Sequence, residues 1–565
     1  PYVREGSNEL RVVAWDPTWT FIASGGKQNE SSGGCFYTRV SGIWQTVWME
    51  EIPECHVQSY RVTTDIDAGE VRFSFVVSPA DPKEPISVEV LGEDGRSVIV
   101  KAMSPVGEDL VLRMPKGYRL WSPDSPTLYS FRARFGHDAF AGYLGMRKID
   151  RARDAKGAWR FRLNGKFIFP LGTLDQGWWP DGLLTPPSLD ACANDIQTLK
   201  RLGFNMLRKH IKIEPRAYYR LCDELGILVF QDAPSPAGIG NILDATKSLQ
   251  RYGMFRREWK EEIDLLANHP SIVMWIPYNE SWGQPDADYT ADTLKWTKRY
   301  DPTRLVGGPS GWNDYEGGEM LCPNPWKIVR DAWRPDEESD NPSADTVDQH
   351  NYPGPGQCKN HRNRISLLGE FGGLGLKVAG HLWSEKDAWG YAGTGAVASR
   401  EANQKHYLEL MDGLIPLVEN GLAGTVYTQT TDVEIEINGL MTYDRKVLKY
   451  DPCVLREAHK RVRGKAALSA AISAQRLGNS TNRSFDLLPR RFGSTYGPNE
   501  TVVIPYQTGG KDADAEVSSF GPVRIDVKDW TGRVVRSVND PVQKGELRLG
   551  AAELGNRFGA FQVVF

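Results

Sequence analysis

Two glutamates in the middle of the chain stand where carboxyl groups do chemistry in many enzymes. Glu280 follows the apolar run 271–276, and Glu370 follows the apolar run 365–368; Trp and Gly residues surround both. Two carboxyl groups that flank a substrate can cleave a glycosidic bond, because one protonates the leaving oxygen while the other attacks the carbon or activates water. Most glutamates are surface or ion-paired residues. The position of these two at the ends of buried-strand patterns favours the catalytic interpretation.

The elements that must position these glutamates alternate between short apolar runs and helical patterns. The pattern predicts helices over 188–202, with Gly203 at the C′ position, and from Pro215 to Gly226, while Phe255, Trp259, Ile263 and Leu266 form a third helical stripe. The runs that we interpret as strands are residues 167–169, 204–207, 227–230, 271–276, 304–306, 346–348, 365–368 and 424–427.

Eight such strand–helix steps over roughly 290 residues predict a (β/α)8 barrel. In this fold the reacting groups lie at the carboxyl ends of the strands, and the fourth and seventh strands lie on opposite sides of the mouth. Glu280 and Glu370 would then face each other. A doubly wound open sheet is the alternative, although no Gly-rich phosphate turn follows the first strand.

Both flanks of the barrel have an all-β pattern. Before it, β-prone runs occur at 9–15, 71–75, 86–90, 98–100 and 109–112, with a break near Pro53 where one β-sandwich would end and another begin. After it, residues 464–482 have the composition of a linker. The runs 501–504, 523–527 and 561–565 then predict a C-terminal β-sandwich over 483–565. The chain begins and ends close to strand patterns, which indicates that the natural polypeptide is longer.

Composition narrows the class of protein. The 565 residues carry 68 Lys and Arg against 72 Asp and Glu, so no basic excess is available to neutralise nucleic-acid phosphates. No run approaches the roughly 18 apolar residues of a membrane span. The 7 cysteines form no CxxC pair, which argues against a structural zinc site, and a single Cys35–Cys55 disulfide stays open. Several of the 18 tryptophans lie in loop-like sequence, where a flat apolar ring suits a sugar.

Three stretches resemble glycoside hydrolase family 2, the family of β-galactosidases, β-glucuronidases and β-mannosidases. They are residues 42–50 (Gly-Ile-Trp-Gln-Thr-Val-Trp-Met-Glu), residues 120–129 (Leu-Trp-Ser-Pro-Asp-Ser-Pro-Thr-Leu-Tyr), and residues 269–275 running into Asn279-Glu280. The resemblance implies the back part of a jelly-roll sugar-binding domain over 1–56, an immunoglobulin-like β-sandwich over 57–152 and a catalytic barrel over 153–463.

The resemblance also implies roles for individual residues. Glu280 resembles the general acid/base and Glu370 the nucleophile of a retaining mechanism, while Asn279 resembles the residue that binds the sugar 2-hydroxyl. Arg208 matches a family residue that orients the nucleophile. Tyr352, which follows His350 after the sixth strand, is placed where it could bond the nucleophile. Further candidates for lining the site are His210, Asp175, Asp232, Trp312, Trp383 and Gln429. No HxH or HExxH spacing exists, so neither a metal nor another cofactor is implied.

The identity of the sugar is left open by departures from the better-known members. The segment 371–377 lacks the Asn-x-Lys pattern of glucuronidases, residues 231–233 (Gln-Asp-Ala) differ from the Asp-Glu of classical galactosidases, and residues 427–432 lack the usual Trp-rich sequence. We expect an exo-acting retaining β-glycosidase, with a β-galactoside as the first candidate substrate and a β-glucuronide, β-mannoside or arabinoside as alternatives. A catalytically inactive carbohydrate-binding protein and a transglycosylase are the rival functions. The expected partner is a glycoside or oligosaccharide, and a homo-oligomer is left open.

Overall fold

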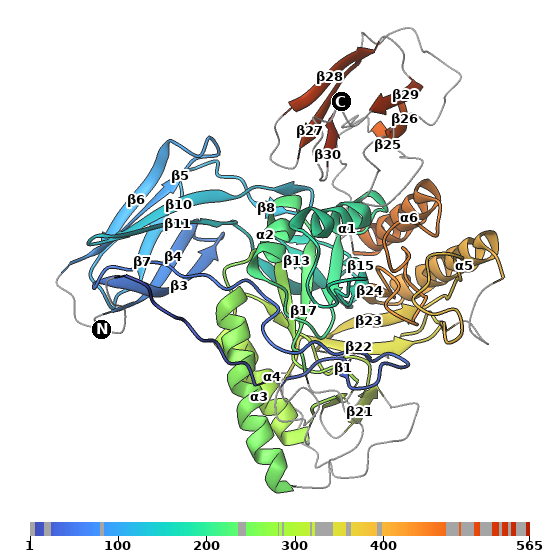
Figure 1. The fold of residues 1–565 in the computed structure, drawn as a ribbon, viewed down its shortest axis with the longest axis horizontal. Coiled ribbons are helices and arrows are strands. Elements are labelled where there is room, and N and C mark those ends of the chain that lie inside the picture. Colours follow the sequence, from blue (N-terminus) through green and yellow to red (C-terminus); the bar gives the residue numbers. More distant parts are fainter. Residues whose placement is uncertain are drawn as a thin grey trace.

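The computed structural model describes most of the chain up to residue 470 and six separate strands beyond it. The described residues are 6–15, 24–78, 84–235, 245–280, 282–284, 287–312, 314–316, 319–322, 343–357, 363–391, 398–470, 485–487, 502–508, 523–529, 534–540, 544–549 and 561–564. Figure 1 shows a central barrel with a β-sandwich beside it. None of the described helices is long and apolar enough to cross a membrane.

The centre of the molecule is a ring of eight parallel strands, as the alternating pattern predicted. In chain order they are β15 (Leu171–Asp175), β16 (Met206–Lys209), β17 (Leu228–Asp232), β18 (Ile272–Ile276), β19 (Leu305–Val306), β22 (Thr346–Asn351), β23 (Ile365–Gly372) and β24 (Leu422–Thr428). They pair in the order β19-β18-β17-β16-β15-β24-β23-β22. The two end strands meet through a hydrogen bond of 2.7 Å from the Asp345 amide to the Val306 carbonyl. The sheet is therefore a nearly closed (β/α)8 barrel.

The first barrel strand is not the run 167–169 that we expected. Lys166–Phe167 (β14) instead pairs antiparallel with Trp159–Leu163 (β13), which also pairs with Ile149–Arg153 (β12). Asn164 and Gly165 join β13 to β14 with φ of 52° and 76°, which is the Asn-Gly hairpin turn. The true first strand, β15, contains Gly172, where a Cβ would lie 2.5 Å from the Met206 carbonyl. A strand broken by glycine gives no continuous apolar run.

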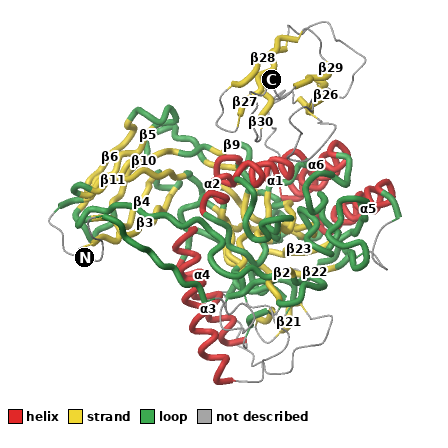
Figure 2. Tube along the Cα trace, viewed as in Figure 1, coloured by secondary structure: helices red, strands yellow, loops and turns green. Residues whose placement is uncertain are grey.

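Helices cover the outside of the barrel (Figure 2). The described ones are α1 (Leu189–Arg201), α2 (Arg216–Leu225), α3 (Ala245–Leu266), α4 (Ala287–Tyr300), α5 (Arg400–Glu419) and α6 (Pro452–Ala470). The predicted ends hold for α1 and α2: Ser188 Oγ accepts a hydrogen bond from the Ala191 amide, and Gly226 ends α2 in the left-handed conformation. Phe255, Trp259, Ile263 and Leu266 of α3 are buried against the barrel.

Helix α6 continues into the segment that we expected to be a linker. The expected linker begins at residue 464, whereas α6 runs to Ala470. Lys465, Ala466, Ala467 and Leu468 are good helix formers, and Ala466 is only 5 % exposed, so packing and propensity both extend the helix. The rest of the expected linker lies outside the described residues.

The sandwich beside the barrel has two antiparallel sheets. One holds β3 (His56–Asp65), β4 (Glu70–Ser78) and β7 (Leu110–Arg113); the other holds β11 (Asp138–Leu144), β10 (Tyr129–Phe135), β5 (Ile86–Leu91) and β6 (Val98–Ser104). Buried and exposed residues alternate along β10, as in a sheet with one face on a core. The guanidinium of Arg147 joins this sandwich to the barrel by donating to the carbonyls of Pro270, Ile272 and Thr303 at 2.8–3.0 Å.

The N-terminal segment differs from the expected strands. Residues 9–15 form no strand; Leu10 and Trp15 are 77 % and 78 % exposed, because no described strand pairs with them. The strands described in this region are the short pair β1 (Gln28–Asn29) and β2 (Tyr37–Thr38), so the partial jelly roll over 1–56 stays a prediction. Cys35 and Cys55 are free thiols, so the disulfide that the sequence left open is not formed.

The remaining strands lie mostly near the C-terminus. Two three-stranded antiparallel sheets contain β25 (Phe485–Leu487), β26 (Val502–Thr508) and β29 (Lys544–Leu549), and β28 (Val534–Asp540), β27 (Val523–Asp529) and β30 (Phe561–Val564). They fit the predicted β-sandwich. Two hairpins, β8 (Trp121–Ser122) with β9 (Ser125–Pro126) and β20 (Asp314–Glu316) with β21 (Glu319–Cys322), complete the described strands.

Candidate active site

The carboxyl ends of the fourth and seventh barrel strands bring Glu280 and Glu370 together. One oxygen of each carboxyl group and a ring nitrogen of His350 lie within 4.8 Å of one another. Glu280 has a φ of 48°, in the left-handed region that a non-glycine residue rarely adopts, and its amide donates to the Ser310 carbonyl at 2.8 Å. Such strain persists where surrounding bonds hold it, often at functional sites. A retaining glycosidase needs its two carboxyl groups about 5 Å apart, which this separation satisfies.

Glu370 is held by two hydrogen-bond donors. The Tyr352 hydroxyl donates to its Oε2 at 2.7 Å, and Arg208 Nη1 donates to its Oε1 at 3.4 Å. Burial and the charge of Glu280 raise the pKa of Glu370, while the charges of Arg208 and Lys27 oppose that rise. Donors that point at a carboxylate favour its ionised form.

Arg208 connects four strands at the base of the site. Its guanidinium donates to both oxygens of Asp232 at 2.8–3.1 Å, to Asn279 Oδ1 at 2.9 Å and to the Gly369 carbonyl at 3.2 Å. The Arg208 side chain is fully buried. A planar guanidinium with several bonded acceptors cannot swing, so Arg208 fixes Asn279 and the backbone next to Glu370.

Glu280 differs from Glu370 in its surroundings. Burial raises the pKa of Glu280 to about 7, against the lowering effect of the Lys27 and Arg208 charges. Two carboxyl groups this close do not ionise together readily, so one proton is shared between them. Because Tyr352 and Arg208 donate to Glu370, the proton belongs on Glu280 near neutral pH.

His350 lies between the two glutamates. Its Nδ1 is 2.7 Å from Glu280 Oε1 and 3.4 Å from Glu370 Oε2. Its Nε2 is 2.8 Å from Ser310 Oγ, and Ser310 Oγ in turn donates to Asp348 Oδ2 at 2.6 Å. Burial lowers the pKa of His350 to about 3, so the ring is neutral.

The other predicted site residues divide into two groups. His210 is 3.8 Å from Glu370 through Nε2, which has no hydrogen-bond partner among the described residues, and its Nδ1 is 2.7 Å from Asp232. Trp312 packs edge-on against the His350 ring with 5.6 Å between centroids. These residues join Arg208, Asn279, Asp232 and Tyr352 around the glutamates.

The second group is not in bonded contact with the glutamates. Asp175 accepts from Lys209 at 2.8 Å and from Tyr218 at 2.6 Å. Gln429 is fully buried and donates to Asn438 at 2.7 Å. Trp383 is 44 % exposed and packs against Tyr443.

Four residues of this site were not predicted from the sequence. Asp348 stands two residues before His350 on β22. Because alternate residues of a strand share a face, the series 348, 350, 352 could have indicated that Asp348 belongs to the site. Tyr391 stacks on Tyr352 with 3.7 Å between ring centroids. Neither Ser310 nor Lys27 carries a comparable sequence signal. Lys27 is 7 % exposed, and its Nζ lies over the rings of Tyr37 and Trp282 at 5.7 and 5.6 Å.

The trio of Glu280, His350 and Glu370 is compact enough to raise the question of a metal ion. Their facing atoms, however, already bond one another, Tyr352 and Arg208. We therefore assign the trio no metal role.

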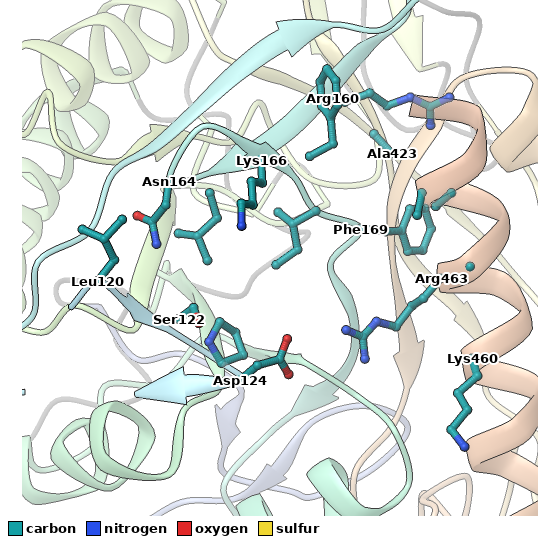
Figure 3. A pocket seen from close by; sticks show the side chains of 17 residues that line it. Leu120, Ser122, Asp124, Arg160, Asn164, Lys166, Phe169, Ala423, Lys460 and Arg463 are labelled. Atoms are coloured by element: carbon teal, nitrogen blue, oxygen red, sulfur yellow. The ribbon is translucent and has the colours of Figure 1, made fainter. Parts of the chain in front are cut away.

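A separate pocket of about 700 Å³ lies at the opposite end of the barrel (Figure 3). Phe169, just before β15, and Ala423, near the start of β24, line it together with Arg463 of α6 and Asp124 of the β8–β9 hairpin. Because reacting groups gather at the carboxyl ends of barrel strands, this pocket is not the candidate active site.

Comparison with known proteins agrees with the barrel and the sandwich beside it. Residues 187–315 match the family model described as glycosyl hydrolases family 2, TIM barrel domain, and residues 55–147 match the model described as glycosyl hydrolases family 2. These matches confirm the resemblance to glycoside hydrolase family 2 that was found in the sequence.

The curated relatives cover part of the chain. A putative β-glucuronidase of Formosa agariphila is 27 % identical over 297 residues, which are 48 % of this chain and 26 % of the relative. A β-galactosidase of Aeromonas hydrophila is 26 % identical over 50 % of this chain and 29 % of the relative. A β-glucuronidase of Sus scrofa is 27 % identical over 47 % of this chain and 41 % of the relative. The matches thus span well under half the length of these relatives.

Solved structures support the fold over a larger share of the chain. A β-glucuronidase from an uncultured Clostridium species superposes with a TM-score of 0.56 at 17 % identity, covering 72 % of this chain and 69 % of that one. A β-glucuronidase from Lactobacillus rhamnosus gives 0.55 at 15 % identity, covering 73 % and 68 %. At this identity the likeness concerns the fold alone.

Proposed function

We propose that this protein is a retaining exo-β-glycosidase that works by double displacement. The observation that carries the proposal is the pair Glu280 and Glu370, whose facing oxygens lie within 4.8 Å but whose surroundings differ. Glu370 receives hydrogen bonds from Tyr352 and Arg208, as an ionised nucleophile requires. Glu280 has a pKa raised to about 7 by burial, as a general acid requires.

The two glutamates would act in sequence. Glu370 attacks the anomeric carbon while Glu280 gives its proton to the leaving oxygen, and a glycosyl-enzyme intermediate forms. Glu280, now a carboxylate, removes a proton from the incoming water, which attacks the same carbon and releases Glu370. The anomeric configuration is retained because the carbon is inverted twice.

Neighbouring side chains would hold the sugar. Asn279 Oδ1 accepts from Arg208, so the amide of Asn279 is oriented to donate to a hydroxyl, and the family resemblance assigns it the 2-hydroxyl. Burial lowers the pKa of His210 well below its usual range, and its neutral ring faces Asp232 with Nδ1. Nε2 of His210 is therefore an acceptor for another hydroxyl. Trp312 adds an apolar face near His350.

The sugar itself is a finer proposal. A β-galactoside remains our first candidate. A β-glucuronide is the second, because the buried cation of Lys27 lies near both glutamates and relatives named β-glucuronidase occur among the matches. A buried cation of this kind suits an anionic substituent on the sugar.

The test is a panel of p-nitrophenyl β-glycosides that includes the galactoside, glucuronide, mannoside and an arabinoside. We expect one of them to be hydrolysed with the β-anomer as the first product by proton NMR. The α-anomer as first product would contradict retention. Binding without turnover of any member would favour the inactive carbohydrate-binding protein, and transfer to an added sugar acceptor in preference to water would favour the transglycosylase.

A further inference from the structure

A third buried carboxyl group, that of Asp348, lies behind the ring of His350. His350 faces Glu280 with Nδ1 at 2.7 Å and Ser310 with Nε2 at 2.8 Å, and Ser310 Oγ is 2.6 Å from Asp348 Oδ2. The four side chains form one continuous hydrogen-bonded chain. Asp348, Ser310 and His350 are at most 6 % exposed, so no bulk water interrupts it.

Two proton arrangements satisfy every bond of this chain. In the first, Glu280 is protonated and donates to His350 Nδ1, His350 Nε2–H donates to Ser310 Oγ, and Ser310 donates to ionised Asp348. In the second, protonated Asp348 donates to Ser310, Ser310 donates to Nε2, and Nδ1–H donates to ionised Glu280. Between the two arrangements, His350 and Ser310 each receive one proton and pass one on, so the net change is one proton moved from Glu280 to Asp348.

We propose that Asp348 shares a proton with Glu280 through Ser310 and His350, and so acts as a positioning residue that sets the proton affinity of the acid/base. The inference rests on the proposed function, in which Glu280 is that acid/base. Asp348, Ser310 and His350 touch no reacting atom in this scheme. They decide which tautomer of His350 faces Glu280.

Burial favours a proton on Asp348 as well as on Glu280. Burial raises the pKa of Asp348 to about 7, the same value to which burial raises the pKa of Glu280. The carboxyl group of Asp348 is fixed against Gly369, where any Cβ would lie 2.2 Å from it. Among the described residues, the other charges that act on this hydrogen-bonded chain are Arg208, which lies 3.5 Å from His350 Nε2 and is paired with Asp232, the carboxylate of Glu370 and the cation of Lys27.

The hydrogen-bonded chain also predicts in which direction the pKa of Glu280 changes when the chain is broken. When both carboxyl groups are ionised, His350 and Ser310 hold only two protons for the three bonds of the hydrogen-bonded chain, whichever ring nitrogen of His350 carries its proton. This arrangement loses one bond, so the intact chain opposes removal of the last proton. Breaking the chain frees His350 to place its proton on Nδ1 and stabilise ionised Glu280. The pKa of Glu280 should then fall.

The experiment compares Ser310→Ala and Asp348→Asn with the unmodified protein. We expect the alkaline limb of kcat/KM, measured with an aryl glycoside that has a poor leaving group, to move to lower pH by about 0.5–1 unit in each variant. The double variant should show the same shift as either single one, because both break one chain. Ser271→Ala is the matched control, since Ser271 is equally buried and its Oγ has no hydrogen-bond partner among the described residues.

An unmoved alkaline limb in both variants would overturn the inference, and so would a uniform loss of rate at all pH values.

If the unmodified protein hydrolyses no glycoside, the proposed function fails. The hydrogen-bonded chain is then tested separately, by NMR titration of the carboxyl carbons in protein labelled with ¹³C-Asp and ¹³C-Glu. Two carboxyl groups that titrate in coupled steps near pH 7, and separately in Ser310→Ala, would support the chain. Independent titration in both proteins would overturn it. Asp348→Asn keeps the shape of the side chain, so this variant replaces Ser310→Ala in the comparison if Ser310→Ala does not fold.

Discussion

At the residue scale, the assignment of roles depends on the different partners of two nearby carboxyl groups. Glu370→Gln removes the nucleophile, so kcat should fall by more than about a thousandfold on every substrate. Glu280→Ala should lower kcat/KM about 10²–10⁴-fold on glycosides with poor leaving groups and leave it nearly unchanged on dinitrophenyl glycosides, which depart without a proton. These expectations are tested by measuring kcat and kcat/KM of both variants on a series of aryl glycosides with good and poor leaving groups. Equal losses on good and poor leaving groups in Glu280→Ala would contradict its role as the acid.

The raised pKa of Glu280 also predicts how the rate depends on pH. A general acid must be protonated, and burial raises the pKa of Glu280 from the ordinary 4.5 to about 7. The rate is therefore expected to persist through weakly acidic pH and to fall as pH rises through about 7. The pH profile of kcat/KM reports this value for the free enzyme. An alkaline limb near the ordinary carboxyl pKa would show that Glu280 is not held in the acid form.

The sequence identified the residues whose chemistry a strand end makes conspicuous. Glu280, Glu370, Arg208 and Tyr352 all follow recognisable strand patterns, and the structure brings them together. Ser310 follows β19, a strand of only two residues, and a serine there has no signature of its own. Its importance comes from the ring of His350, which no local pattern reveals.

At the element scale, the helix ends could be predicted better than the strand starts. Ser188, Pro215 and Gly226 act locally, through one cap or one backbone conformation, so the sequence specifies them. The first barrel strand was misplaced because Gly172 interrupts its apolar run, and residues 9–15 were predicted as a strand although strands need a partner. Pairing is decided by distant segments, which sequence patterns do not show.

Gly226 offers a stability prediction at this scale. It has a φ of 72°, and a Cβ there would lie 2.6 Å from the Pro123 carbonyl of the β8–β9 hairpin. Gly226→Ala should therefore lower the free energy of unfolding by at least about 2 kcal/mol, from left-handed strain and the backbone shift. Gly253→Ala is the opposite case, because Gly253 lies inside α3 with nothing within 4 Å. It should raise stability by about 0.5–1 kcal/mol. Urea unfolding of both variants measures the contrast, and equal effects would contradict this account.

At the scale of the whole molecule, the segment 24–38 joins the start of the chain to the mouth of the barrel. The Gly26 amide donates to the Pro234 carbonyl at 3.3 Å, and the Thr38 amide donates to Glu434 at 2.9 Å. Tyr37 donates to Glu436, and Phe36 stacks on Trp282 with 5.3 Å between centroids. These bonds link residues that are hundreds of positions apart in sequence. They bring Lys27 close to the site from outside the barrel, so the barrel sequence alone does not reveal it.

Lys27 is therefore the place to test whether this segment takes part in catalysis. Its charge lowers the pKa of both Glu280 and Glu370, so Lys27→Met should raise these pKa values and move the alkaline limb of kcat/KM to higher pH by about half a unit. This shift is opposite in sign to the one expected for Ser310→Ala. Lys27→Arg keeps the charge and should leave the limb in place. If Lys27→Met lowers only the melting temperature and the limb stays where it was, the segment packs on the barrel without acting on its chemistry.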